Sequence, residues 1–214
     1  MEVSNAAVDD YVRSVLARHD EPVLLEMEAR AAEHGFPIVG RMVGVVLELL
    51  ARSIGATRVF ELGSGFGYSA YWFSRAIGPD GEIHLTDRDP DNERLAKDFL
   101  GRAGLDRPIT FHVGDSNESL KATDGQFDVV FCDVDKGSYP AAWQAARDRI
   151  RPGGLYLCDN TLGWGSASVV TGEGTPREWI DAVREHNIMV TSDEEFLSTI
   201  LPIREGVMVA RRSG

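Results

Sequence analysis

The stretch RVFELGSGFGYSA, residues 58–70, places three glycines at alternate positions directly after a short apolar run. The apolar run predicts a buried strand, and the segment after the glycines has the apolar spacing of a helix. Alternating glycines permit positive φ and let a ligand approach the backbone where the helix offers free N–H groups. The stretch therefore predicts a strand, a loop of the nucleotide-binding type and a helix, although dinucleotide sites and purely structural turns use the same spacing.

The same order of short apolar run and helix-length segment continues along the chain. Further runs are EIHLT (82–86), ITFHV (109–113), FDVVFCD (127–133) and GLYLCD (154–159). This alternation indicates βαβ units and a parallel sheet with helices on both faces. After a predicted helix at 176–186, two apolar runs on either side of Arg204-Glu205-Gly206 predict a hairpin that adds an antiparallel edge.

Apolar residues also recur at helical spacing ahead of residue 57, in the segments 8–16, 24–27 and 42–50, which predicts three helices. We therefore expect one domain over residues 1–214, with N-terminal helices in 1–55 and an α/β core in 56–214. The stretch WGSASVVTGEGTP, residues 164–176, is rich in Gly, Ser and Thr and has no clear period. It predicts a surface loop and a candidate lid.

Composition argues against several classes of partner and site. The net charge of −12 and the pI near 4.8 would repel nucleic acid and anionic membranes, so we expect a small-molecule partner. The chain lacks an apolar run of about 20 residues and a signal-like start, which predicts a cytoplasmic protein. Cys132 and Cys158 lie inside predicted strands and are expected to be buried thiols. The five histidines are scattered, so a metal would need oxygen ligands.

Residues at the predicted strand ends indicate the ligand of the glycine loop. Glu61, two positions before the first glycine, would repel a pyrophosphate but suits a cation such as the ammonium of a methionine moiety. Asp87 ends the next strand about 20 residues later, where a carboxylate can accept both ribose hydroxyls. Asp115 and Ser116 follow the third strand, where small polar groups could hold an adenine edge. For these last three residues, helix capping is the alternative.

The next two predicted strands end in Asp133 and in Asp159-Asn160. If these strands are parallel neighbours about 4.8 Å apart, the three side chains converge. Two carboxylates and an amide oxygen suit Mg²⁺ or Ca²⁺ and do not suit zinc. Taken singly, an aspartate at a strand end is more often a turn former or a helix cap.

Lys136 follows in the stretch FCDVDKGSY, residues 131–139, and is one of three lysines against nineteen arginines. A lysine beside a metal and a cationic cofactor can lose its proton and act as a general base, which arginine cannot do. The alternative is a solvated loop lysine.

The chain resembles a known family from about Pro37 to Arg212. The signatures are FELGSGFGYSA (60–70), DVDK (133–136), PGGLYLCDN (152–160) and LPIREGVMVARR (201–212). They resemble class I S-adenosylmethionine-dependent, divalent-metal-dependent O-methyltransferases of the catechol and caffeoyl-coenzyme A type. The resemblance implies a Rossmann-like, seven-stranded, mostly parallel sheet in the order 3-2-1-4-5-7-6 with strand seven antiparallel, and it implies a homodimer.

By the same resemblance the candidate residues receive roles. Lys136 is similar to the family's catalytic lysine, and Asp135 and Trp164 would face the acceptor. A divalent cation, Mg²⁺ with Ca²⁺ or Mn²⁺ as alternatives, would bind Asp133, Asp159 and Asn160. The residues expected at S-adenosylmethionine are Val39, Glu61, Gly63, Ser64, Gly65, Tyr68, Ser69, Asp87, Arg88, Asp115, Ser116 and Asp133.

Two segments depart from the family pattern, because residues 161–165 are lengthened and residues 37–44 lack an acidic residue before the glycine. Both segments face the variable substrate in related enzymes, so the resemblance does not identify the acceptor. The expected reaction is methyl transfer to one hydroxyl of a vicinal dihydroxy, catechol-type small molecule. The alternatives are a natural-product hydroxyl such as a sugar diol, a Rossmann NAD-dependent oxidoreductase and a non-catalytic cofactor-binding protein.

Overall fold

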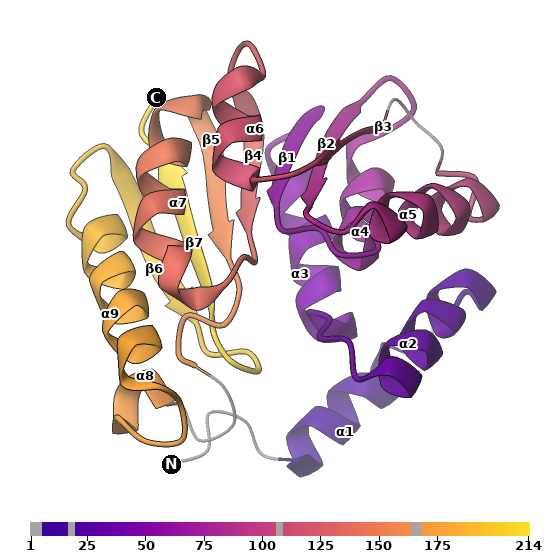
Figure 1. Cartoon of the computed structure of the whole chain (residues 1–214), viewed down its shortest axis with the longest axis horizontal. Helices are drawn as coiled ribbons and strands as arrows, with labels where there is room; N and C mark the ends of the chain where they lie inside the picture. Colours follow the sequence, from indigo (N-terminus) through magenta and orange to yellow (C-terminus); the bar gives the residue numbers. More distant parts are fainter. Residues whose placement is uncertain (1–5, 17–19, 106–108, 164–167) are drawn as a thin grey trace.

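The computed structural model describes residues 6–16, 20–105, 109–163 and 168–214. Its centre is a seven-stranded sheet in the order β3-β2-β1-β4-β5-β7-β6 (Figure 1). β7 is antiparallel to β5 and β6, whereas β1 to β5 pair in parallel. The α/β fold class, the strand order and the antiparallel seventh strand are confirmed. The strands are β1 (Arg58–Leu62), β2 (Glu82–Asp87), β3 (Ile109–Val113), β4 (Phe127–Cys132), β5 (Ile150–Cys158), β6 (Phe196–Leu201) and β7 (Val207–Arg212).

The helices follow the amphipathic segments of the sequence. The three helices expected ahead of the sheet are α1 (Ala6–Val15), α2 (Pro22–His34) and α3 (Gly40–Ser53). The others are α4 (Tyr68–Ile77), α5 (Pro90–Arg102), α6 (Ser116–Ala122), α7 (Tyr139–Ala146), α8 (Ser168–Thr171) and α9 (Arg177–Thr191). A short 3₁₀ turn at Lys136–Ser138 leads into α7, and another at Arg147–Arg149 follows it.

Alternate residues of the central strands pack against opposite helix layers. On β1, Val59 joins an apolar core with residues of α2 to α5, and Phe60 joins a second core with residues of α6, α7 and α9. This division follows from the two-residue period of a strand. Figure 1 shows α7 and α9 side by side over one face of the sheet. Because both faces are covered, side chains that need access to a ligand lie at the strand ends.

Two sequence predictions are corrected in detail. β5 begins at Ile150 and not at residue 154, because Gly153, with φ of 78°, lets the strand continue through an irregular register opposite Phe127 and Val129. The predicted loop 164–176 is helical at Ser168–Thr171, where Val169 is buried in the core beside α9. Residues 164–167 lie outside the described residues.

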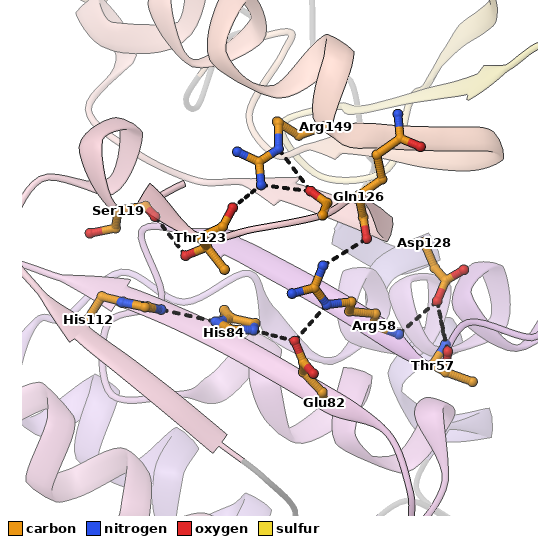
Figure 2. Close-up of polar contacts among 11 residues, drawn as sticks. Thr57, Arg58, Glu82, His84, His112, Ser119, Thr123, Gln126, Asp128 and Arg149 are labelled. Atoms are coloured by element: carbon orange, nitrogen blue, oxygen red, sulfur yellow. Dashed lines mark hydrogen bonds and ion pairs between the residues drawn. The ribbon is translucent and has the colours of Figure 1, made fainter. Parts of the chain in front are cut away.

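A polar network joins β1, β2 and β3 (Figure 2). His84 Nδ1 lies 3.0 Å from His112 Nε2, and His84 Nε2 lies 2.6 Å from Glu82 Oε1. The same carboxylate accepts a hydrogen bond of 2.6 Å from Arg58 Nε. Phe60 stacks on both imidazole rings. These two histidines therefore link the neighbouring strands β2 and β3.

Cys132 and Cys158 are aligned partners on β4 and β5, and both are free and buried, as expected. Among the residues that the structure describes, no helix combines the length and the apolar character that crossing a bilayer requires.

Candidate active site

A cavity of about 990 Å³ opens at the carboxyl ends of the parallel strands. Glu61 is fully buried and is not among the residues that line it, and Trp164 lies outside the described residues. The other residues expected at the site all line this one cavity: Val39, Gly63, Ser64, Gly65, Tyr68, Ser69, Asp87, Arg88, Asp115, Ser116, Asp133, Asp135, Lys136, Asp159 and Asn160.

Thr86, at the end of β2, holds the glycine loop in place. The Gly63 N–H donates to Thr86 Oγ1 at 3.0 Å, and that hydroxyl donates to the Glu61 carbonyl at 2.8 Å. Gly63 has φ of 82°, and a Cβ at this position would lie 2.5 Å from the carbonyl oxygen of Asp133. Glycine is therefore required here both for its backbone conformation and for the close approach of β1 to the end of β4.

Asp87 organises the same loop. Its Oδ2 accepts from the Gly65 N–H at 3.1 Å, while its Oδ1 accepts from the Asp89 N–H and from Asn92 Nδ2. The cap of α5 is Asp89, whose side chain accepts from the Asp91 N–H. Helix capping therefore does not explain Asp87, which contacts the glycine loop directly.

Asp115 differs, because it caps α6. Its Oδ1 accepts from the N–H groups of Asn117 and Glu118 at 3.0 and 3.1 Å, and its Oδ2 lies 3.3 Å from Arg88 Nη2. The hydrogen bond from the Glu118 N–H, with these others, holds the pKa of Asp115 below its usual range. The capping alternative is correct for this residue, which also lines the cavity.

Glu61 is a buried carboxyl behind the glycine loop. Burial raises its pKa to about 8, against a partial lowering by the nearby hydroxyls of Ser64 and Ser69 and a further rise from the charge of Asp133. Neither carboxyl oxygen has a partner of hydrogen-bond geometry among the described residues. A carboxyl in this position gains most from a cation that approaches it.

Asp133 and Asp159 converge, as the strand pattern predicted. Cys132 and Cys158 are aligned on β4 and β5, and the Asp159 N–H donates to the Cys132 carbonyl at 3.1 Å. Burial, together with the charge of Asp133, raises the pKa of Asp159 to about 8. Asp159 Oδ1 is buried and has no hydrogen-bond partner within the described part of the chain.

Lys136 is buried, and its ammonium lies among the candidate metal ligands. Its Nζ donates to Asp133 Oδ1 at 3.1 Å, to Asn160 Oδ1 at 2.6 Å and to Tyr139 Oη at 2.5 Å. Tyr139 in turn donates to the Asp159 carbonyl at 2.8 Å. The solvated-loop alternative for Lys136 is therefore wrong, because only 5% of the residue is exposed.

The donor set limits the kind of metal that this site could hold. Within residues 6–16, 20–105, 109–163 and 168–214, no cluster of three or more His, Cys, Asp or Glu side chains could hold a metal ion. The candidate ligands are instead two carboxylates and the amide of Asn160, which adopts a left-handed φ of 56°. Such all-oxygen sets suit hard cations with open positions for water or substrate.

Sequence reasoning missed Thr86, Tyr139, Phe36 and Arg204. Tyr139 had a local signal, since it lies three residues after Lys136 at the start of α7. Phe36 and Arg204 had none, because their contacts with the glycine loop and with Ile38 join segments far apart in the sequence.

Comparisons with known proteins address the reaction. A family model described as O-methyltransferase matches residues 15–213. The chain belongs to this O-methyltransferase family. Catechol O-methyltransferase from Niastella koreensis is 30% identical to it over 201 residues, which cover 91% of this chain and 89% of the relative. Caffeoyl-CoA O-methyltransferase 2 from Zea mays is 30% identical over 211 residues, which cover 93% and 79%.

Solved structures agree with this O-methyltransferase assignment. TomG from Streptomyces achromogenes, an O-methyltransferase of tomaymycin synthesis in complex with S-adenosylmethionine, is 27% identical, with a TM-score of 0.85 over 97% of this chain and 96% of TomG. The Bacillus cereus O-methyltransferase in complex with S-adenosylhomocysteine has a TM-score of 0.85 at 24% identity over 97% of both chains, which shows the shared fold. The expected S-adenosylmethionine-dependent O-methyltransferase is thus confirmed, and the oxidoreductase and non-catalytic alternatives are wrong.

Proposed function

We propose that this enzyme transfers the methyl group of S-adenosylmethionine to one hydroxyl of a vicinal dihydroxy, catechol-type small molecule, with a divalent cation at Asp133, Asp159 and Asn160 and with Lys136 as the general base. The observation that carries the proposal is the contact of Lys136 Nζ with both Asp133 and Asn160 in one cavity. Base and candidate ligands thereby meet at one point of that cavity.

The glycine-loop end of the cavity has the chemistry of a site for the methyl donor. Glu61 is assigned to the donor's ammonium, because it is a buried carboxyl for which the described residues provide no hydrogen-bond partner, and such a group suits a cation. Asp87 is assigned to the ribose hydroxyls, and Asp115 and Ser116 to the adenine side. The remaining residues assigned to this end are Val39, Gly63, Ser64, Gly65, Tyr68, Ser69, Arg88 and Asp133.

The other end of the cavity has the donor set of a divalent-cation site. Asp159 Oδ1 is buried without a hydrogen-bond partner among the described residues, and a second carboxylate lies beside it. A cation would satisfy that oxygen and would offset the repulsion between the carboxylates. When bound, the methyl donor supplies an electrophilic carbon, and the cation supplies positive charge that favours the ionised form of an acceptor hydroxyl.

Lys136 is assigned the proton transfer. Lys136 is largely shielded from solvent, and Tyr139 and Asn160 hold its Nζ in position. In the proposed reaction Lys136 acts as the neutral amine. It takes the proton of the attacking hydroxyl while the oxygen bonds to the methyl carbon and the bond from that carbon to the donor's sulfur breaks, which leaves S-adenosylhomocysteine. The Asp133 carboxylate, 3.1 Å from Nζ, then stabilises the ammonium that results.

The acceptor is proposed as a catechol-type diol because two adjacent oxygens can share one cation. Relatives named for catechol and for caffeoyl-CoA support that class. The net charge of −12 also favours a small molecule over a nucleic acid. Asp135 and Trp164 are the residues that we assign to the acceptor side. A homodimer and a cytoplasmic location stay predictions, and sedimentation velocity would test the first.

The deciding experiment measures release of S-adenosylhomocysteine from a panel of vicinal-dihydroxy aromatics, monohydroxy analogues and sugar diols. We expect turnover with the aromatic diols in Mg²⁺ and its loss in EDTA. Equal turnover of monohydroxy analogues, or turnover that persists in EDTA, would contradict the metal-bridged diol. Turnover of sugar diols alone would support the metal site but would identify a sugar diol, and not a catechol, as the acceptor.

A further inference from the structure

Arg204 adopts a backbone conformation that is unfavourable for its residue type. It lies in the turn between β6 and β7 with φ of 49°, in the left-handed region. Among the described residues, the non-glycine residues with positive φ are Arg204 and Asn160. Both line the cavity at the carboxyl ends of the parallel strands. Such strain persists where the surroundings hold it in place, and it is concentrated at functional sites.

The Arg204 side chain holds the link between α2 and α3, residues 35–40, which we call the strap. Arg204 Nη1 donates to the Ile38 carbonyl at 3.0 Å and also to the Val39 carbonyl. The strap ends at Gly40, where a Cβ would lie 2.6 Å from the same Nη1. The guanidinium therefore lies directly against the strap backbone, at the start of α3.

The other end of the strap lies against the glycine loop. The Phe36 ring packs edge-on against Phe66, with ring centroids 5.0 Å apart. A Cβ on Gly65 would lie 2.8 Å from the Phe36 ring. Phe36 thus contacts the loop assigned to the methyl donor, while Ile38 and Val39 are held by Arg204. Between these two contacts the strap borders the cavity, since residues 35–40 are all among its lining.

The turn that carries Arg204 is itself fixed to the segment after the candidate metal ligands. The Thr161 N–H donates to the Gly206 carbonyl at 3.0 Å, and the Leu162 N–H donates to the Glu205 carbonyl at 2.8 Å. A Cβ on Gly206 would lie 2.5 Å from Leu162. Motion of the turn relative to Asn160 would break these backbone contacts.

We propose that Arg204 is a positioning residue that fastens the strap over the methyl donor. It thereby sets the distance between the strap and residues 161–162, which follow the candidate metal ligands. Arg204 touches no reacting atom in this arrangement and acts through the backbone of Ile38 and Val39. The inference rests on the proposed function for what the strap covers. The fastening itself rests only on the contacts of Arg204.

The test uses Arg204→Gly, because glycine accepts the left-handed φ and the variant loses only the side chain. In the protein without ligand, amide hydrogen exchange over residues 36–42 should accelerate at least roughly ten-fold, since two hydrogen bonds from a charged donor are removed. Binding of S-adenosylhomocysteine, measured by calorimetry, should weaken roughly ten-fold, because the closed strap is less populated. The KM for S-adenosylmethionine should rise more than kcat falls.

Two further variants separate the fastening from other effects. Glu205→Gln removes the charge that lies 3.3 Å from Arg204 Nε and should leave strap exchange unchanged. Arg204→Lys keeps a cation but loses the planar guanidinium. In this variant the amides of residues 36–42 should exchange at an intermediate rate. Wild-type exchange over 36–42 in Arg204→Gly would overturn the inference, whatever the activity. Failure of the wild-type enzyme to bind S-adenosylhomocysteine would instead overturn the proposed function. The exchange rates would still show whether Arg204 holds the strap in place.

Discussion

Asp133 and Asp159 each follow one of two aligned cysteines on neighbouring parallel strands, and burial together with the charge of Asp133 raises the pKa of Asp159 to about 8. Two neighbouring carboxyls, of which Asp159 is buried and Asp133 is partly exposed, are unfavourable unless they share a proton or a cation. The resulting cost at this end of the sheet is the physical basis for the first prediction.

Asp159→Asn should weaken binding of Mg²⁺ and Mn²⁺ at least roughly ten-fold, because one of two anionic ligands becomes neutral. The metal-free variant should also melt at a higher temperature, since an ionisable buried group is removed. Calorimetric metal titration and thermal unfolding check both effects. The matched control is Asp98→Asn on α5, where the side chain is half-exposed, and it should change neither the metal affinity nor the melting temperature. Undiminished metal affinity in Asp159→Asn would show that the cation binds elsewhere.

Lys136→Ala should reduce kcat roughly 100-fold or more while the affinity for S-adenosylhomocysteine changes little, because the lost group moves the acceptor's proton. Single-turnover kinetics at saturating methyl donor, with calorimetry, separate the two quantities. Lys121→Ala on α6 removes an exposed lysine and should leave both unchanged. Wild-type kcat in Lys136→Ala would exclude the base assignment.

Glu61→Gln should stabilise the ligand-free protein and impair cofactor binding together. The folded-state pKa of Glu61 is raised to about 8 from 4.5, so folding must protonate this group above pH 4.5. Between these two values the folded state binds more protons than the unfolded state, and stability falls as pH rises. The cost at pH 7 is about 3 kcal/mol, which the amide avoids. Thermal melts with and without S-adenosylhomocysteine test this prediction, and a variant that melts lower without ligand and still binds would refute it.

The affinity for S-adenosylhomocysteine should also depend on pH through Glu61. The raised pKa keeps this carboxyl protonated below about pH 8, whereas the ligand's ammonium needs the ionised form. Affinity should therefore rise as pH increases from 6 towards 8, by at most about ten-fold per pH unit. Calorimetry in EDTA and in an Asp159→Asn background isolates Glu61 from any metal and from the Asp159 carboxyl, whose pKa is also raised to about 8. The Glu61→Gln protein should give a flat profile, and a flat wild-type profile would remove Glu61 as the counter-ion.

The sequence predicted those parts of the site whose signals are local. Asp133 and Asp159 each follow a continuous apolar run, and parallel pairing then brings them together without further information. Asp87 and the glycine loop follow the same logic. Strand and helix positions could be predicted for the same reason, because each segment carries its own period.

The remaining features depend on tertiary contacts that no local pattern encodes. The burial of Lys136 requires Tyr139 and Asn160 on different elements, and the left-handed φ of Arg204 has no signature in its residue type. α8 lies in a stretch rich in glycine and serine, where burial of Val169 beside α9 outweighs weak helix propensity. The start of β5 is likewise not marked by an apolar run, because the strand from Ile150 continues through Gly153 with an irregular register.

Gly63→Ala should damage both ends of the cavity with one methyl group. Gly63 has φ of 82°, and the added Cβ would meet the Asp133 carbonyl oxygen at 2.5 Å, so the glycine loop and the end of β4 must separate. We expect a loss of about 2–4 kcal/mol in the free energy of unfolding, from left-handed strain and overpacking. Affinity for S-adenosylhomocysteine and for Mg²⁺ should fall together, because Asp133 moves with its backbone.

Gly101→Ala, near the end of α5 with no atom close to the added Cβ, should instead be neutral or stabilising by up to about 1 kcal/mol. Denaturant unfolding and calorimetry of the two variants check the pair. Loss of cofactor affinity with unchanged Mg²⁺ affinity in Gly63→Ala would show that the glycine loop and the metal end do not share the Asp133 backbone as their common support.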